Sequence, residues 1–337
     1  MLTVILYYKL HRFARMVFIK IDKLPKIWYN IISIVRTMRI FRMRFDTPEV
    51  FMRKYIDLHT HSCFSDGTDT PAELIDKAIE RGLCAIALTD HNTTGGLMEL
   101  ISYAEGKNIY AIPGIEISSD YGEKELHIVG LFLEPQHFSK IEDVMREMNR
   151  RKTESNINLI NNLKADGYDI DYESVSARTS GEAFNRAHVA AHLVEKGYFE
   201  KRQDAFKTVL AKNGKYYHAP KRITAIEAIR LLRSCDAVPI LAHPYLSLDE
   251  YELLEFLPEA KKAGLVGMET IYSSYDRETE IMAAKIAARF SLFESGGSDY
   301  HGKNKVDVEL GVGKGEMAVP KEILERLLGV KLSFENN

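Results

Sequence analysis

From about residue 55 onward, the chain alternates short apolar runs with longer amphipathic stretches. The apolar runs have the length of buried strands. Besides a first run at 56–61, they fall at 84–92, 110–118, 125–133, 237–245, 265–272 and 291–301. Alternating strands and helices predict parallel strand pairing with the helices outside, and therefore an α/β fold.

The segment TPAELIDKAIERG (70–82) shows how the helices between the runs are specified. Thr70 and Glu73 have the spacing of a capping box, in which each side chain binds the other's backbone N–H. Pro71 suits the first helical position, and Gly82 suits the position just beyond the helix end. The sequence therefore predicts a helix between the first two strands.

The alternating rhythm is interrupted after residue 139 and resumes near residue 224. The interval is polar, with apolar residues at helical spacing, and it predicts an inserted helical subdomain. We expect a basic extension at 1–51, the first part of a barrel at 52–139, the insertion at 140–222, and the second part of the barrel at 223–337.

The first 54 residues carry twelve Lys or Arg and three Asp or Glu, whereas the whole chain has a net charge of −3. Large apolar residues are interspersed with these charges, but no clean apolar run precedes a small-residue cleavage site. Three interpretations remain open: a leader translated from an upstream start codon, an arm that contacts RNA or a membrane surface, and an anchor.

Composition adds a few limits. Apolar residues make up 45% of the 337 positions, which is enough for a sizeable core, and no window of about 18 residues is both apolar and uncharged. The three cysteines are scattered and form no C-x-x-C pair, which fits a reducing compartment. We expect a cytoplasmic protein, and no feature of the sequence indicates a stable protein partner.

Candidate chemistry begins with IDLHTHSCFSDG (56–67). On a strand, alternate side chains share a face, so His59 and His61 would point the same way, with Asp66 just beyond. Nitrogen and oxygen ligands of this kind suit Zn, Mn or Fe. The alternative is a surface strand that happens to carry two histidines.

The distribution of the eleven histidines favours a metal site. Most apolar runs deliver a histidine or carboxylate at or near their end, and functional groups of parallel barrels gather at the carboxyl ends of strands. These residues are His91, Glu116, His243, Asp299 and His301. His127 differs, because it lies early in its run.

Six motifs then carry a family resemblance. DLHTHSCFSDG, LTDHNT, GIEIS, LHIVG, AHP and GSDYHG occur in the order seen in the PHP (polymerase and histidinol phosphatase) superfamily, which the chain resembles over residues 52–310. The insertion, with NRAHVAAHLVEKGY, is similar to the branch of stand-alone nucleoside 3′,5′-bisphosphate phosphatases. Some members of that branch are 5′–3′ exonucleases on short RNA. The chain departs from the pattern at NRAH, often R-P-H in the branch, and at Asn92, often a second aspartate.

The resemblance implies a distorted (β/α)7 TIM-like barrel that holds two to three divalent metal ions (Mn, Zn or Fe). It implies that one ion is held by His59, His61, Glu116 and Asp299, a second by Glu116, His127 and His243, and a third by Asp66, His91 and His301. Asp66, His91, Glu116, His243 and Asp299 are the residues expected to be catalytic.

Metal ions would neutralise the charge of a phosphate ester and lower the pKa of bound water to about 7. A metal-bridging hydroxide would then attack, with no Ser or Cys nucleophile. Asp57 and Asp90 are the expected hydrogen-bond partners of the ligating histidines. Glu269, at a strand end, could lie near the site or form a plain ion pair.

Four residues are predicted to bind a nucleotide or short RNA substrate: Arg186, His188, Lys215 and Tyr217. For Arg186 and His188 the alternative is a solvated helix face. Competing functions are a histidinol-phosphatase-like or broad-specificity phosphatase, and a non-catalytic module that binds metal or nucleic acid.

Overall fold

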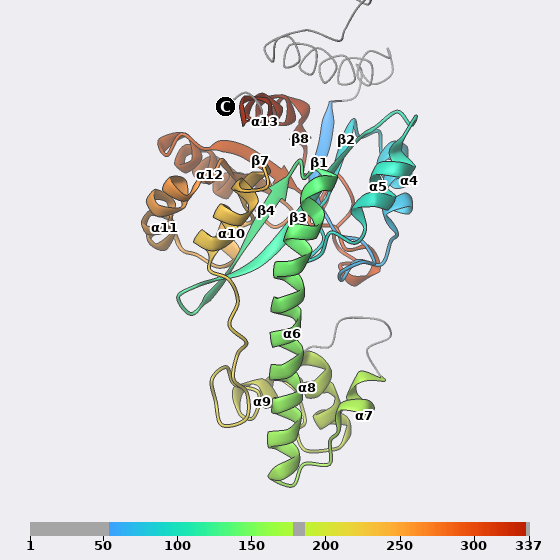
Figure 1. Cartoon of the computed structure of the whole chain (residues 1–337), viewed down its shortest axis with the longest axis vertical. Coiled ribbons are helices and arrows are strands. Elements are labelled where there is room, and N and C mark those ends of the chain that lie inside the picture. The colour runs from blue at the N-terminus through green and yellow to red at the C-terminus, as the bar shows by residue number, and fades with distance from the viewer. Residues whose placement is uncertain (1–53, 178–185, 335–337) are drawn as a thin grey trace, which may run out of the picture. The chain divides into compact units, whose positions relative to one another are not determined.

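The computed structural model describes residues 54–177 and 186–334. The predicted extension at 1–51 lies outside these residues. Eight strands form one sheet in the order β7-β6-β5-β4-β3-β2-β1-β8, with helices packed around it (Figure 1). The strands are β1 (Tyr55–Thr60), β2 (Ala85–Leu88), β3 (Tyr110–Tyr121), β4 (Lys124–Leu131), β5 (Val238–Leu241), β6 (Gly267–Tyr272), β7 (Phe293–Gly297) and β8 (Val319–Pro320). The predicted α/β class and barrel-like architecture are confirmed.

The helices connect and cover these strands. They are α4 (Pro71–Glu80), α5 (Leu97–Ala104), α6 (Pro135–Ala165), α7 (Tyr172–Ser176), α8 (Arg186–Glu195), α9 (Arg202–Lys207), α10 (Ala225–Arg233), α11 (Glu250–Ala263), α12 (Arg277–Arg289) and α13 (Lys321–Phe334). The capping box of Thr70 and Glu73 is present at the start of α4, with Pro71 at the first helical position. Gly82 has a φ of +72°, as expected just beyond a helix end.

The expectation of parallel pairing is wrong for β4 and for the short β8, which is antiparallel to β1. Strand β4 forms an antiparallel hairpin with β3 and is also antiparallel to β5. Only Gly122 and Glu123 separate β3 from β4, and Gly122 has a φ of +58°. Two residues cannot make a crossover connection, so β4 must run back along β3. The start of β4 therefore lies where the parallel strands end.

The sheet curls round so that β7, at one end of the strand order, approaches β1 near the other end. The Asp299 N–H donates to the His59 carbonyl oxygen at 2.8 Å, and Thr60 forms a parallel bridge with Tyr300. A Cβ atom at Gly297 would lie 2.4 Å from the His59 backbone nitrogen. Only glycine allows this approach, which brings the ends of the first and last parallel strands together.

Helix α6 belongs to two hydrophobic cores. Its first half places Ile141 and Met145 in the core between the sheet and the surrounding helices. Its second half places Leu159 and Leu163 in a separate core with α8 and α9. The insertion therefore has its own core, and the expected boundary at residue 140 falls inside a continuous helix. Along residues 54–177 and 186–334, no helix is long and apolar enough to cross a membrane.

Candidate metal centre

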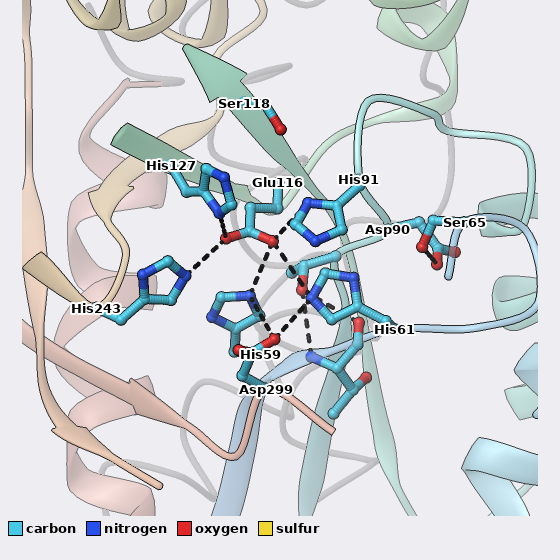
Figure 2. Close-up of polar contacts among 12 residues, drawn as sticks. His59, His61, Ser65, Asp90, His91, Glu116, Ser118, His127, His243 and Asp299 are labelled. Carbon is cyan, nitrogen blue, oxygen red and sulfur yellow. Dashed lines mark hydrogen bonds and ion pairs between the residues drawn. The ribbon is translucent and has the colours of Figure 1, made fainter. Parts of the chain in front are cut away.

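Glu116 of β3 lies at the centre of a cluster of histidines at the strand ends (Figure 2). Its side chain is fully buried, and its two oxygens face different histidines. Oε1 lies 2.7 Å from His127 Nδ1 and 3.0 Å from His243 Nε2. Oε2 lies 3.2 Å from His59 Nε2, 3.3 Å from His61 Nε2 and 2.9 Å from His91 Nδ1. A carboxylate in this position can bridge two ions.

Two aspartates complete the cluster. Asp299 Oδ1 lies 3.1 Å from His61 Nε2, and Asp66 Oδ1 lies 3.2 Å from His301 Nε2. Three groups of side chains place their ligand atoms within 4.8 Å of one another. They are His61, Asp66, His91 and His301; His59, His61, Glu116 and Asp299; and His91, Glu116 and His127.

All nine predicted ligands therefore lie in one cluster. The set expected for the first ion matches one of the three groups, and the set expected for the third ion matches another with His61 added. His243 lies outside the three groups but contacts Glu116 Oε1 directly, beside His127. Which residues hold which ion stays a prediction.

Strand geometry explains how these residues meet. His59 and His61 point to the same side at the end of β1, as their two-residue spacing predicted, and both reach Glu116 Oε2. His127 lies early in its strand because β4 is antiparallel to its neighbours, so the start of β4 lies beside the ends of the others. The residue that broke the sequence pattern is thus accounted for by one strand reversal.

Two ligands have unusual backbone conformations. His243 has φ and ψ of 26° and 56°, and Asp299 has a φ of 56°. Non-glycine residues seldom adopt positive φ, and such strain is often found at functional sites. Each residue lies two positions after the end of its strand, where this backbone turn directs the side chain back toward Glu116 and the histidines.

The cluster has the properties of a metal site. Within the described part of the chain, five of its buried side-chain atoms make no hydrogen bond, although buried polar atoms are normally paired. They are His59 Nε2, His61 Nδ1, His61 Nε2, His91 Nδ1 and Glu116 Oε2. A carboxylate oxygen and one nitrogen of each neutral imidazole offer the lone pairs that Zn, Mn and Fe accept, so bound cations would satisfy four of these five atoms. The residues present therefore fit the expected ions.

Without cations, the histidines and carboxylates compensate one another. Burial lowers the pKa of His61, but the negative carboxylates of Asp299 and Glu116 beside its ring outweigh burial and raise the pKa to about 9. Burial likewise opposes the effect of Glu116 on His127, whose pKa rises to about 10. Burial raises the pKa of Glu116, but His91, His127 and His59 hold it well below its ordinary value. The site therefore strongly favours negative carboxylates beside positive charge.

A second layer of side chains holds the ligands. Glu269 lies within β6 rather than at its end, and it contacts both His59 and the backbone of His243. Asp57 instead accepts hydrogen bonds from Ser298, Gly311 and the His59 backbone. Asp90 accepts from Ser62 and Ser65. The two aspartates expected to bind histidine rings thus hold loops and strand ends.

Tyr272 and Lys305 were not among the predicted site residues, yet both donate hydrogen bonds to Asp299 Oδ2, at 2.8 Å and 2.6 Å. The register of β6 against β7 shifts between Glu269 and Ile271, so one extra residue on β6 changes the alternation. Glu269 and Tyr272 are three positions apart, so regular alternation would place them on opposite faces of the strand. The register shift instead lets both side chains reach the site. Lys305 follows the GSDYHG motif closely, and that proximity was the available signal.

Asn92, which departs from the family pattern, has a structural role. Its φ is 52°, and asparagine tolerates this left-handed conformation. Its amide nitrogen donates to Ser118 Oγ at 3.1 Å, and its amide oxygen accepts from the Ser118 N–H at 3.0 Å. The side chain thus joins the loop after β2 to the strand that carries Glu116.

The four predicted substrate-binding residues lie in the insertion. The Arg186 guanidinium stacks 4.2 Å from the Tyr217 ring centroid and donates to the Leu210 carbonyl oxygen. Tyr217 is buried in the helical core, and Lys215 is paired with Asp166. His188 is half-buried on α8, two residues after Arg186. These described contacts belong to the insertion, so a role in substrate binding stays a prediction.

Other cations lie closer to the cluster. Arg222, where the insertion returns to the barrel, lies 2.7 Å from Glu125, and Glu125 lies 3.3 Å from His127 Nε2. Desolvation and the charge of Arg222 lower the pKa of Lys152 on α6, while Glu125 and Asp66 oppose them. Arg222 and Lys152, near the two ends of the insertion, thus place positive charge beside the candidate metal ligands.

Fold and site together define a class: an α/β barrel protein with a His, Asp and Glu metal centre at its strand ends. The model of the PHP domain matches residues 57–219. A phosphoribosyl 1,2-cyclic phosphate 1,2-diphosphodiesterase from Eggerthella lenta is 30% identical over 73% of this chain and 94% of its own. A 5′–3′ exoribonuclease from Haemophilus influenzae is 30% identical over 74% and 91%. A 3′,5′-nucleoside bisphosphate phosphatase from Chromobacterium violaceum is 30% identical over 73% and 87%.

Solved structures share this fold. A protein described as a metal-dependent phosphoesterase from Bifidobacterium adolescentis superposes with a TM-score of 0.64 and 27% identity, covering 82% of this chain and 96% of the other. A structure described as an amidohydrolase from Chromobacterium violaceum, with bound sulfate, gives a TM-score of 0.66 and 26% identity over the same shares. The chain belongs to the PHP family.

Proposed function

We propose that this protein is a metal-dependent phosphoesterase that removes the 3′-phosphate from nucleoside 3′,5′-bisphosphates and also degrades short RNA in the 5′–3′ direction. The observation that carries the proposal is Glu116, whose two buried oxygens face two sets of histidines. Hydrolysis of phosphoric esters is the chemistry of the family to which the chain belongs.

The chain's own residues define how the centre would work. His59, His61, Glu116 and Asp299 would hold one of two to three ions, Glu116 with His127 and His243 another, and Asp66, His91 and His301 the third. Such ions neutralise phosphate charge and activate water near neutral pH. Glu116 fixes the spacing between sites, while Tyr272 and Lys305 hold Asp299 in place.

Several features support a nucleotide with more than one phosphate as the substrate. Two relatives are named for nucleoside bisphosphates and for RNA, which share a sugar carrying phosphates on both sides. Arg222 and Lys152 add positive charge beside the cluster. Arg186, His188, Lys215 and Tyr217 are our candidates for the remaining contacts. Arginine suits this task, because its planar fork donates two N–H bonds to phosphate oxygens.

We place this reaction in the cytoplasm, where nucleotides and short RNAs occur and where the three free cysteines would remain reduced. The basic segment at 1–51, outside the described residues, would contact RNA or a membrane surface if it is translated. Zn, Mn and Fe are all compatible with the ligands.

A substrate panel tests the proposal. Metal-depleted protein would be reconstituted separately with Mn, Zn and Fe, and each form assayed on adenosine 3′,5′-bisphosphate, adenosine monophosphates, a short RNA, histidinol phosphate and a sugar cyclic phosphodiester. The cyclic compound is included because one relative is a cyclic phosphate diphosphodiesterase. We expect the highest kcat/KM on the bisphosphate. If kcat/KM is higher on histidinol phosphate or the cyclic ester, that compound class becomes the preferred substrate and the proposal is wrong. If no substrate is hydrolysed with any metal, the protein is better explained as a non-catalytic module.

A further inference from the structure

The side chain of Glu269 spans two parts of the proposed metal centre. Its carboxylate is almost fully buried, with 2% of the residue exposed. Oε1 lies 2.8 Å from His59 Nδ1, and Oε2 accepts a hydrogen bond from the His243 backbone N–H at 2.6 Å. His59 and His243 contact opposite oxygens of Glu116, so one carboxylate holds a residue from each side of the cluster.

The first contact fixes which nitrogen of His59 carries a proton. An ionised carboxylate can only accept hydrogen bonds, so His59 Nδ1 must donate. Once a cation is bound, the other ring nitrogen, Nε2, would be free to offer its lone pair to an ion shared with Glu116 and Asp299, whose oxygens lie 3.2 Å and 3.7 Å away. That nitrogen is buried and makes no hydrogen bond within the described residues. The orientation is the one that a metal ligand requires.

The second contact fixes a strained backbone. His243 has a φ of 26°, a conformation that non-glycine residues seldom adopt. Its N–H points at Glu269 Oε2, so the same carboxylate stabilises the turn that directs His243 Nε2 to Glu116. A residue that supports strain at a ligand contributes to the position of that ligand.

We infer that Glu269 is a positioning residue that sets the tautomer of His59 and the backbone turn at His243, and thereby controls metal affinity on both sides of Glu116. The inference rests on the proposed metal centre but not on the choice of substrate. It does not make Glu269 a metal ligand or a group that contacts the substrate.

The substitution Glu269→Gln tests the inference with little change of shape. Glutamine has one acceptor oxygen and one donor NH₂ group, whereas the site presents two donors. If the oxygen faces the His243 N–H, the NH₂ group faces His59 Nδ1 and forces the proton onto Nε2. If the oxygen faces His59, the His243 N–H loses its acceptor. Either orientation disturbs one of the two ligands.

The readout is metal binding rather than activity. Metal-depleted wild-type and variant proteins would be titrated with Co²⁺, following its visible absorption, and bound metal counted by elemental analysis. We expect Glu269→Gln to weaken the binding of at least one Co²⁺ ion by about 10- to 100-fold, the usual effect of removing a hydrogen-bond partner of a metal ligand. Glu294→Gln is the matched control, because Glu294 lies on neighbouring β7 and binds Thr270 and Arg326 instead. Its affinities should equal those of the wild type.

Activity then separates positioning from catalysis. The hydrolytic defect of Glu269→Gln should shrink as Co²⁺ is raised, and Glu269→Asp, which keeps an acceptor-only carboxylate, should lose less affinity than the glutamine variant. Unchanged Co²⁺ affinity in Glu269→Gln, or an activity loss that persists at saturating metal, would overturn the inference.

A measurement on the wild type does not depend on the variant's folding. In the Zn-loaded protein, ¹⁵N chemical shifts of the histidine rings should show His59 protonated at Nδ1 and metal-bound through Nε2. Metal at Nδ1 would overturn the inference. Failure of the wild type to bind metal would instead refute the proposed function.

Discussion

His127 Nδ1 lies 2.7 Å from Glu116 Oε1, although the two residues approach from strands that run in opposite directions. The hairpin between β3 and β4 pairs His127 directly with Ser118, two residues beyond Glu116. A fully parallel arrangement would have placed the start of β4 at the other end of the barrel. The reversal of this one strand therefore supplies a ligand to the centre of the cluster.

The protein should bind two to three divalent ions per chain. Five buried atoms of the cluster lack hydrogen bonds in the described residues, and the ligands form partly shared groups. Elemental analysis after reconstitution with Mn or Zn checks the number. Binding should also raise the midpoint of thermal unfolding, because a ligand specific to the folded state stabilises it. Less than one ion per chain would contradict a multinuclear centre.

Asp299→Asn and His243→Ala should each abolish most hydrolysis. Removing a direct ligand should cost more than the roughly 10- to 100-fold typical of an outer partner, so we expect kcat/KM to fall by more than about 100-fold. Asp307→Asn and His137→Ala are the matched controls, because Asp307 pairs with Lys314 and His137 lies beside Asp236 on the barrel's exterior. Near-normal turnover by a variant verified to lack metal would show that the mechanism is wrong.

Metal binding at pH 7.5 should release protons. The pKa of His61 is raised from 6.5 to about 9 and that of His127 to about 10, so both are protonated in the metal-free protein, whereas ligating histidines must present a lone pair. Calorimetric titration in buffers of different ionisation enthalpy measures the released protons. Metal affinity should therefore rise from pH 6.5 to 9, and proton uptake on binding would contradict the expectation.

The same shifts set the stability of the metal-free protein. Because these folded-state pKa values lie above the ordinary value of 6.5, the stability they contribute is fully present below about pH 6.5. It is lost as pH rises through 9 and 10. Urea unfolding across this range should show a falling free energy of unfolding without metal, and a smaller fall with metal bound.

Arg186→Ala should reduce kcat/KM more for a 3′,5′-bisphosphate than for a nucleoside monophosphate, while metal content stays unchanged. One lost charge-assisted hydrogen bond is worth about 1.5–3 kcal/mol, or roughly 10- to 100-fold in transition-state binding. Arg202→Ala is the control, because Arg202 is an exposed arginine of α9 in the same insertion.

The contacts of Arg186 with Tyr217 and Leu210 suggest an alternative role, in which Arg186 stabilises the insertion instead of binding substrate. If Arg186 only stabilises the insertion, the variant should unfold at lower temperature and lose activity equally on both substrates. Thermal unfolding measured beside the kinetics separates the two roles.

Deleting residues 1–51, so that the protein starts at Met52, should leave hydrolysis unchanged. The barrel pattern begins with β1 at Tyr55, and the ligands all lie beyond it. Steady-state kinetics and gel filtration of the shortened protein check this. An insoluble or inactive product would show that the segment supports the domain, and loss of RNA or vesicle co-sedimentation alone would favour the arm.

The sequence was sufficient for most strands because a buried strand is a local pattern. Apolar runs marked the buried strands, and a two-residue spacing placed His59 and His61 on one side. The capping box at Thr70 is likewise a contact between residues three apart. The nine candidate ligands came from the motifs of the family resemblance, and the structure brings them into one cluster; that they bind metal stays a prediction.

The direction of β4, the orientation of Tyr272 and the partner of His59 depend on strand pairing and on contacts between residues far apart in the sequence, which a local pattern cannot predict. The direction of β4 is set by its hairpin, and Tyr272 faces the site only because the register of β6 shifts after Glu269. The partner of the His59 ring could not be chosen among Asp57, Asp90 and Glu269 from sequence, since Glu269 is 210 positions away. Pairings of this kind are decided by the folded barrel.

Helix α6 also has an evolutionary consequence. Its 31 residues extend about 46 Å at 1.5 Å per residue, and its two halves pack in different cores. The candidate metal ligands all lie in the barrel, so substitutions in the separate core of the insertion would leave them in place. The proposed metal centre could then be kept while the residues that we propose for substrate binding change.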